Sequence, residues 1–295
     1  MKITSGNIFN DFLDAIYTRG ATWSTVIAYQ KDLEYFKKWY EETNETGLVA
    51  EQITSIDLRE YQSYLQNVRE LKPATINRRV AVLKQYFKWI QRERLISRLP
   101  NFPKVIKEQK VQPKALHRNE QNRLLREVER RGKARDIALV RLLMNCGLRA
   151  SEAVTIRIMD LDVGDRHGRL VVRGKGNKYR EVPVPPETRQ TLREWLAERE
   201  MQLAYLNSPW LFPSRYGEHI SVRYVEQVIK NLGKFIGLNV HPHILRHTAA
   251  TNMIRTGADL VTVANILGHA NLNTTAIYTK PDTKTMAEAL AKGEI

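Results

Sequence analysis

The stretch RLPNFPKVIKEQKVQPKAL, residues 98–116, limits how the rest of the chain can fold. Its prolines, Pro100, Pro103 and Pro113, lack the amide hydrogen that a helix needs, and the segment shows no helical period. Such a basic, proline-rich segment is typical of a linker between two folded parts. A length of 295 residues also suits two domains of about 150 residues each. We therefore predict a helical domain over 1–100, a basic linker over 101–114 and a second domain over 115–295.

Four segments before this linker repeat apolar side chains at the spacing of helices, and the clearest spans residues 72–96. We expect one face of that helix to lie in the core, and this face carries Ile76, Val80, Leu83, Phe87 and Ile90. In the segment before it, Thr54 or Ser55 is suited to be the N-cap residue. The first domain is therefore predicted to be all helical.

The chain carries a formal net charge of +15, which indicates a polyanionic partner such as nucleic acid or an anionic membrane surface. The charge is concentrated: residues 71–110 hold eleven lysines and arginines against Glu93 and Glu108, a net charge of +9. A basic helix face is usually only solvated, but here few acidic residues balance it. We expect four residues on the outward face of the 72–96 helix to contact DNA phosphates: Arg78, Arg79, Lys84 and Lys88.

Other classes of protein are disfavoured. The single cysteine, Cys146, permits no internal disulfide and indicates a reducing compartment. The first twenty residues lack the apolar run and cleavage site of a signal peptide, and no window approaches the roughly 18 apolar residues of a membrane span. We expect a cytoplasmic protein with no membrane partner, which would be nucleoid-associated if its polyanionic partner is DNA.

The hydrophobic period changes once in the second half of the chain. In RLVVRGKGNKYREVPV, residues 169–184, apolar residues alternate on both sides of a glycine-containing turn, which predicts a β-hairpin. The segments around it have helical spacing. The expected fold class is therefore mainly α with a small β-sheet, and the second domain is of the α+β type.

The stretch HPHILRH, residues 241–247, carries polar groups at the start of a predicted helix. With Pro242 at the first helical position, His243 and Arg246 share a face near the N-terminus, where a phosphate is favoured. His243 and His247 also have a zinc-ligand spacing, but Ile244 stands where the zinc-protease pattern has glutamate, and a neighbouring guanidinium repels a cation. We predict no metal and no cofactor; His247 is expected to pack, and His241 has no assigned role.

Polar residues in other segments are also candidates for a functional role. Arg149 lies in NCGLRASE with Glu152 three residues on, Lys175 lies at the hairpin tip, His269 follows Gly268, and Tyr278 lies in TTAIYTK. Taken singly, each has an ordinary interpretation, such as a surface ion pair, an exposed turn lysine or a core tyrosine.

In this order, the motifs G-L-R-x-S-E, G-K-G-N-K, H-x-L-R-H, L-G-H and I-Y-T resemble the tyrosine site-specific recombinase, or phage integrase, family, and most of all its two-domain Xer-type members. The segments TVIAYQKDLEYF and ATINRRVAVLKQYFKW are similar to the core-binding domain of that family. The resemblance covers essentially the whole chain. It implies a helical, SAM-like core-binding domain followed by an α+β catalytic domain.

The resemblance also implies roles for seven residues around a DNA phosphate. They are Arg149 and Arg246 as phosphate clamps, Lys175 as general acid for the leaving 5′-oxygen, His243 for the proton of the nucleophile, His269 for a non-bridging oxygen, Tyr278 as nucleophile and Glu152 as supporting acid. Lys178 is a weaker alternative to Lys175.

The function that follows from the resemblance is site-specific recombination through a 3′-phosphotyrosyl intermediate and a Holliday junction. The implied partners are a double-stranded DNA core site and a homo-tetramer on two duplexes, with or without a related recombinase or accessory protein. Dimer resolution, transposon resolution and element integration all stay open. No arm-binding domain is expected, which favours a recombinase acting on a simple core site.

Two alternatives remain. A monomeric nicking-closing enzyme of the type IB topoisomerase kind has related chemistry, and a catalytically silent DNA-binding relative would keep the fold alone. The tail, residues 284–295, places Met286, Ala289 and Leu290 on one face suited to docking into a neighbouring protomer, which favours the recombinase over the monomeric enzyme. The complete residue set disfavours the silent relative.

Overall fold

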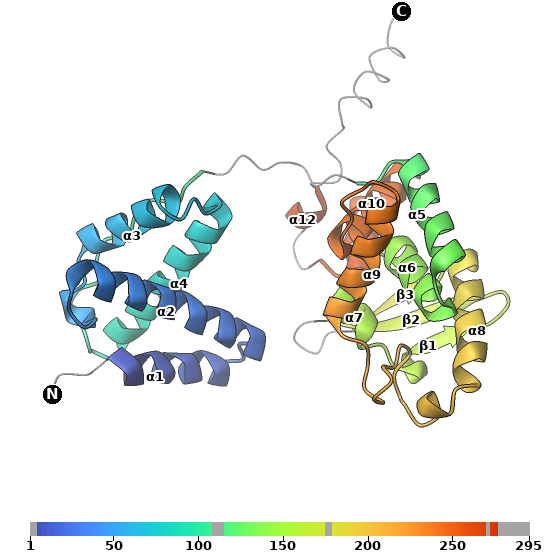
Figure 1. Cartoon of the computed structure of the whole chain (residues 1–295), viewed down its shortest axis with the longest axis horizontal. Coiled ribbons are helices and arrows are strands. Elements are labelled where there is room, and N and C mark those ends of the chain that lie inside the picture. Colours follow the sequence, from blue (N-terminus) through green and yellow to red (C-terminus); the bar gives the residue numbers. More distant parts are fainter. Residues whose placement is uncertain (1–4, 108–114, 175–178, 270–271, 277–295) are drawn as a thin grey trace, which may run out of the picture. The chain divides into compact units, whose positions relative to one another are not determined.

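The structure is a computed structural model that describes residues 5–107, 115–174, 179–269 and 272–276. The chain divides into two compact units, Met1–Lys110 and Val111–Ile295, each of which is described by itself (Figure 1). As predicted, the fold is mainly helical with one small antiparallel sheet.

The first unit is helical throughout its described residues. Its elements are α1 (Ser5–Thr18), α2 (Trp23–Asn44), the short 3-10 helix η1 (Ala50–Gln52), α3 (Ser55–Asn67) and α4 (Pro73–Arg92). The N-cap of α3 is Thr54, whose hydroxyl accepts from the amides of Ile56 and Asp57, while the Asp57 carboxylate accepts from the Thr54 amide.

The core of this unit is built on the predicted face of α4. Ile76, Leu83, Phe87 and Ile90 are almost fully buried, whereas Val80 is only partly buried. Aromatic rings from other helices pack against this face at edge-to-face angles, as Phe12 does against Tyr86, a ring of α4.

Part of the predicted linker packs onto this first unit. The side chain of Asn77 donates to the carbonyl of Ile106 at 2.9 Å and accepts from the Ile106 amide at 2.9 Å. The Phe102 ring lies 5.9 Å from the Phe87 ring. The compact first unit therefore extends through residue 106, although this segment is not helical. The side-chain amide of Asn77 supplies hydrogen-bond partners to the backbone amide and carbonyl of Ile106.

The second unit surrounds one buried helix, α6. The elements in chain order are α5 (Arg118–Arg131), α6 (Ala134–Cys146), α7 (Ala150–Val154), η2 (Ile158–Asp160), β1 (Leu161–Val163), β2 (Gly168–Arg173), β3 (Tyr179–Pro183), α8 (Pro186–Glu200), η3 (Leu203–Tyr205), α9 (Val222–Phe235), α10 (Pro242–Arg255), α11 (Leu260–Leu267) and α12 (Asn273–Ala276). Helices α5, α8 and α10 pack against α6. Its side chains Leu139, Leu142 and Leu143 are fully buried.

The predicted hairpin is present as β2 and β3, and β1 adds a third strand that the sequence pattern did not reveal. The strands pair in the order β1-β2-β3, with Leu170 opposite Val182 and Val172 opposite Arg180. Helix α8 runs beside this sheet in Figure 1, and α11 contacts β3. The end of α11 is thereby brought to the edge of the sheet.

Two helix ends meet beside the sheet because of a glycine. Gly147 ends α6 with φ +65°, in the left-handed region. A Cβ atom at this position would lie 2.6 Å from the Cδ2 atom of Leu267, the last residue of α11. A larger residue would therefore have to displace the buried side chain of Leu267. Among the helices that the structure describes, none is long and apolar enough to cross a membrane.

We predict that Gly147→Ala costs clearly more stability than Gly237→Ala, its matched control. Both glycines have a similar positive φ, +65° and +70°, but nothing lies within 4 Å of a Cβ atom at Gly237. The backbone strain of about 1–2 kcal/mol is therefore shared, and only Gly147→Ala adds an overpacking cost of about 1–3 kcal/mol. Urea unfolding of the two variants measures the difference, and equal free energies of unfolding would contradict the close approach.

Candidate active site

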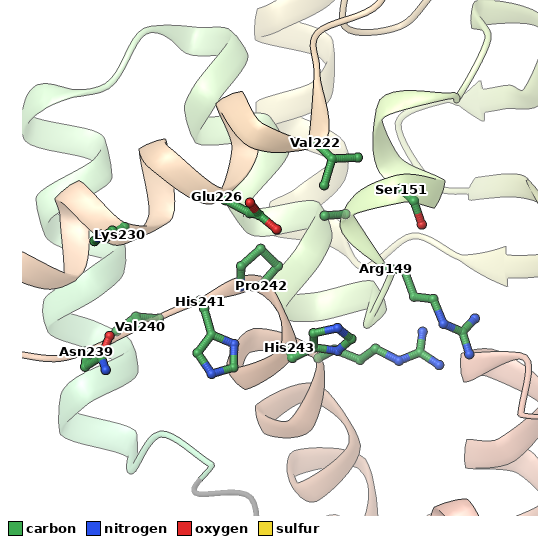
Figure 2. Close-up of a pocket in the computed structure, with 12 residues that line it drawn as sticks. Arg149, Ser151, Val222, Glu226, Lys230, Asn239, Val240, His241, Pro242 and His243 are labelled. Carbon is green, nitrogen blue, oxygen red and sulfur yellow. The ribbon is translucent and has the colours of Figure 1, made fainter. Parts of the chain in front are cut away.

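A pocket of about 490 Å³ opens between α7, α9 and the start of α10 (Figure 2). It is lined by Arg149, Ala150, Ser151, Val222, Glu226, Lys230, Asn239, Val240, His241, Pro242, His243 and Arg246. Three of the residues that the sequence singled out, Arg149, His243 and Arg246, therefore line one pocket although almost a hundred positions separate the first from the other two.

The start of α10 has the geometry that the sequence predicted. Pro242 is the first helical residue and His241 is the N-cap residue. The rings of His241 and His243 lie 6.3 Å apart in an edge-to-face arrangement, next to one another in Figure 2. Arg246, one turn into the helix, is 4% exposed.

The guanidinium of Arg246 is held by backbone carbonyls at two helix ends. It donates from Nη1 to the carbonyl of Gly147 and from Nη2 to the carbonyl of Leu267, each at 2.7 Å. Carbonyls in the last turn of a helix have no intrahelical partner and carry partial negative charge. Cations bind well there, so α6 and α11 fix the plane of this guanidinium.

Arg149 and Glu152 are held together at the start of α7. Arg149 is the N-cap residue; its amide donates to Oε2 of Glu152 at 2.8 Å, and its Nη1 donates to Oε1 at 2.7 Å. The side chain of Arg149 is 38% exposed, whereas that of Glu152 is 6% exposed. The buried carboxylate therefore orients an arginine that reaches the pocket.

A third arginine, which the sequence analysis missed, completes this cluster. Arg180 donates from Nη1 and Nη2 to the two carboxylate oxygens of Glu152, at 3.0 and 2.9 Å, and from Nε to the carbonyl of Ile266 at 2.8 Å. A signal for it exists: Arg180 shares a strand face with the buried Val182, so it is an arginine at an inward-facing position.

The arginines keep the carboxyl group of Glu152 ionised. Burial alone would raise its pKa, but the hydrogen bonds from Arg180 and from the Arg149 amide, with the charges of both arginines, hold the pKa below its ordinary value. The Nη1 atom of Arg246 also lies 3.8 Å from Oε2. Within the described part of the chain, three guanidiniums thus surround one carboxylate.

His269 follows Gly268, which ends α11 with φ +67°. The Nδ1 atom of His269 shares a 2.8 Å hydrogen bond with the hydroxyl of Thr275, a fully buried residue of α12. The sequence analysis missed Thr275, because a threonine near a helix end is commonplace.

His243 and His269 are neutral near pH 7. Burial, and then the charges of Arg246, Arg149 and Arg180, lower the pKa of His269 to about 4. Desolvation in the pocket wall, followed by His241 and Arg246, also lowers the pKa of His243 from its ordinary 6.5. A neutral imidazole can accept a proton at one nitrogen and donate from the other.

His247, expected to be a packing residue, lies partly buried on α10. Burial, and then the neighbouring His243 and Arg246, lower its pKa to about 4. Among the residues that the structure describes, no group of three histidine, cysteine, aspartate or glutamate side chains could hold a metal ion.

Several predicted residues lie outside the described residues: Lys175 and its alternative Lys178, Tyr278, and the tail over 284–295. Arg173 and Gly174 lead to Lys175 in the sequence, and α12 ends at Ala276, two positions before Tyr278.

The basic face of α4 is smaller than predicted. Arg78 forms a bidentate ion pair with Asp32, a buried residue of α2. The prediction that Arg79 faces outward is wrong: its side chain is 14% exposed, its Nε lies 3.6 Å from Asp32, and its guanidinium lies 4.3 Å from the centre of the Tyr35 ring. A buried carboxylate needs cationic partners, which explains both contacts. Lys84 and Lys88 are exposed.

Two family models match the chain. The model of the Phage integrase family matches residues 114–285, and the model of the Phage integrase, N-terminal SAM-like domain matches residues 9–94.

Relatives match the chain over almost its whole length. A protein named tyrosine recombinase XerC from Chromobacterium violaceum is 33% identical over 282 residues, covering 94% of this chain and 91% of that protein. A protein of the same name from Thermodesulfovibrio yellowstonii is 32% identical over 285 residues, covering 93% and 91%. A solved structure of XerH site-specific recombinase bound to difH substrate, a pre-cleavage complex, is 25% identical with a TM-score of 0.74, covering 96% of this chain and 84% of that chain.

The lowered pKa values predict that acid destabilises the folded protein. An unfolded histidine binds a proton below pH 6.5, whereas His247 and His269 bind one only near pH 4. The unfolded state therefore binds more protons between these values, so the free energy of unfolding falls as the pH is lowered from 6.5 toward 4, by at most about 1.4 kcal/mol per pH unit for each group.

We predict that His247→Gln reduces this loss, measured by urea unfolding at pH 7, 6 and 5. His167→Gln is the control, because the side chain of His167 is 67% exposed, and we expect it to retain the wild-type pH dependence. An unchanged pH dependence in His247→Gln would show that His247 does not resist protonation in the folded state.

Proposed function

The chain belongs to the phage integrase family and is a site-specific DNA recombinase that cuts and rejoins DNA strands, and we propose that Tyr278 attacks a DNA phosphate held by Arg149 and Arg246. The observation that carries this proposal is the presence of Arg149, His243 and Arg246 in the wall of one pocket. Two guanidiniums and a neutral imidazole, one from the N-cap of α7 and two from α10, line this pocket.

Each residue type matches one demand of the reaction. A phosphodiester under attack gathers negative charge on its non-bridging oxygens, and planar guanidiniums bind two such oxygens at once. Preorganised donors of this kind are typically worth about 3–4 kcal/mol each. Both arginines are oriented by Glu152 or by helix-end carbonyls, so they need little rearrangement during the reaction.

The proton transfers follow from the ionisation of the side chains. A tyrosine hydroxyl has an ordinary pKa of about 10, so Tyr278 needs a proton acceptor, and a neutral His243 can act as one. The tyrosine oxygen then bonds to phosphorus, the bond to the 5′-oxygen breaks, and Lys175 donates a proton to that oxygen. One phosphoester replaces another in this 3′-phosphotyrosyl intermediate, so rejoining by a 5′-hydroxyl needs no ATP.

We further propose a double-stranded DNA core site as the partner, with the N-terminal domain, 1–100, and the catalytic domain, 115–295, both contributing. The exposed Lys84 and Lys88 on α4 are the best candidates for phosphate contacts in the first domain. The solved XerH complex with difH substrate supports DNA binding by this fold. A tetramer on two duplexes, passing through a Holliday junction, is the proposed assembly, and the recombinase relatives favour it over the monomeric topoisomerase-like alternative.

We predict that Tyr278→Phe binds core-site DNA with unchanged affinity but forms no covalent adduct. The ring remains and only the attacking oxygen is lost. The measurement is formation of the covalent adduct on a nicked duplex, from which the short fragment that carries the 5′-hydroxyl is released after cleavage. Every reaction contains EDTA, because the proposed chemistry uses no metal. An adduct that persists in Tyr278→Phe would assign the nucleophile to another residue.

We predict that deleting residues 284–295 leaves cleavage at a single site intact but prevents recombination between two sites. The removed segment carries Met286, Ala289 and Leu290, the apolar residues expected to dock into a neighbouring protomer. Native gel shifts separate single-duplex complexes from paired duplexes. Wild-type pairing and recombination by the truncated chain would contradict docking of the tail into a neighbouring protomer.

A further inference from the structure

Arg180 joins three segments that carry proposed active-site residues. It is the second residue of β3, and its side chain is 14% exposed. Its guanidinium binds both oxygens of Glu152 on α7 and the carbonyl of Ile266 near the end of α11. The end of α11 leads directly to His269.

The backbone of that turn lies close against the arginine. Gly268 has φ +67°, and a Cβ atom added there would lie 2.8 Å from Nη1 of Arg180 and 3.0 Å from its Cζ. Glycine is therefore needed for the turn to approach the guanidinium this closely. The position of His269 thus depends on a contact made by Arg180.

The charge arrangement gives Arg180 a second effect. Glu152 is a buried carboxylate, and such a group needs cationic or hydrogen-bonding partners. Arg180 occupies both of its oxygens in a bidentate pair, the strongest geometry for this contact. Without Arg180, the cations left near Glu152 would be Arg149, at 2.7 Å, and Arg246, at 3.8 Å. These are the two arginines needed at the DNA phosphate.

We propose that Arg180 is a positioning residue of the cleavage reaction. It satisfies Glu152, so that Arg149 and Arg246 stay oriented toward the phosphate, and it fixes the end of α11, so that His269 stays in place. Arg180 itself does not contact the DNA. This inference rests on the proposed function, because it concerns the geometry of the same site.

The test compares Arg180→Gln and Arg180→Lys with wild type. Arg169→Gln is the matched control, because Arg169 lies on the neighbouring strand β2, is 56% exposed, and pairs with the exposed Glu181 at 3.4 Å. The probe is a duplex selected by the wild-type protein from a random-sequence library and nicked to trap the adduct. Single-turnover adduct formation gives the rate of the chemical step, and gel shifts give the affinity.

We expect Arg180→Gln to slow adduct formation by about 10- to 100-fold, because a misplacement of about 1 Å in reacting groups can cost about 100-fold. Its affinity for the duplex should stay within about threefold of wild type. Arg180→Lys keeps the charge but cannot span both oxygens, so its rate should be intermediate. Arg169→Gln should match wild type. If Arg180→Gln and Arg180→Lys lose affinity for the duplex but form the adduct at the wild-type rate, the proposal is overturned.

A double-variant comparison separates positioning from general loss of structure. If Arg180 acts largely through Glu152, Arg180→Gln should slow the Glu152→Gln variant by much less than it slows wild type. Independent effects that multiply in the double variant would overturn the proposal. Thermal unfolding checks that each variant is folded at the assay temperature. If Arg180→Gln is not folded, Arg180→Lys decides the question, and a wild-type rate of adduct formation in Arg180→Lys would overturn the proposal. A wild-type protein that forms no adduct would instead refute the proposed function.

Discussion

One buried negative charge organises the proposed active site. Glu152 is 7% exposed and accepts hydrogen bonds from Arg149 and Arg180, with Arg246 close by. Like-charged guanidiniums repel one another, so a cluster of them needs an anion at its centre to be stable without DNA. The carboxylate supplies this anion on the inner side of the cluster. The site therefore keeps a local excess of positive charge, which a bound phosphate can neutralise.

Carbonyl groups at two helix ends orient the guanidinium of Arg246, as the Glu152 carboxylate orients that of Arg149. The carbonyls of Gly147 and Leu267 accept its hydrogen bonds, and the neighbouring carbonyl of Ile266 accepts one from Arg180. These acceptors are available because α6 and α11 both stop at glycines with positive φ, Gly147 and Gly268. The glycines of the G-L-R and L-G-H motifs are therefore part of the site: each ends a helix where an arginine needs an oxygen.

Features that depend on local sequence patterns could be predicted from the sequence, whereas contacts between residues far apart in the chain could not. The buried face of α4, the β2-β3 hairpin and Pro242 at the start of α10 follow from periodicity and helix-end chemistry, and the structure confirms them. The burial of Arg79 was mispredicted because its partner, Asp32, lies 47 positions earlier, and nothing in the local pattern reveals that a buried carboxylate will recruit it. Arg180 was detectable as an inward-facing arginine in a strand, but its partners lie in other elements.

Permanent cations and neutral imidazoles divide the work of the site, and each depends on the other. The charges of Arg246, Arg149 and Arg180 help to keep His269 neutral, so it carries one N–H that must be on the correct nitrogen. Thr275 shares a hydrogen bond with Nδ1, and its hydroxyl can donate or accept. A phosphate oxygen only accepts. In the proposed reaction, a phosphate at Nε2 therefore selects the tautomer protonated there, and Thr275 becomes the donor to Nδ1. Burial, together with the charges of the arginines that bind the phosphate, thus keeps His269 in the neutral state in which it can join them.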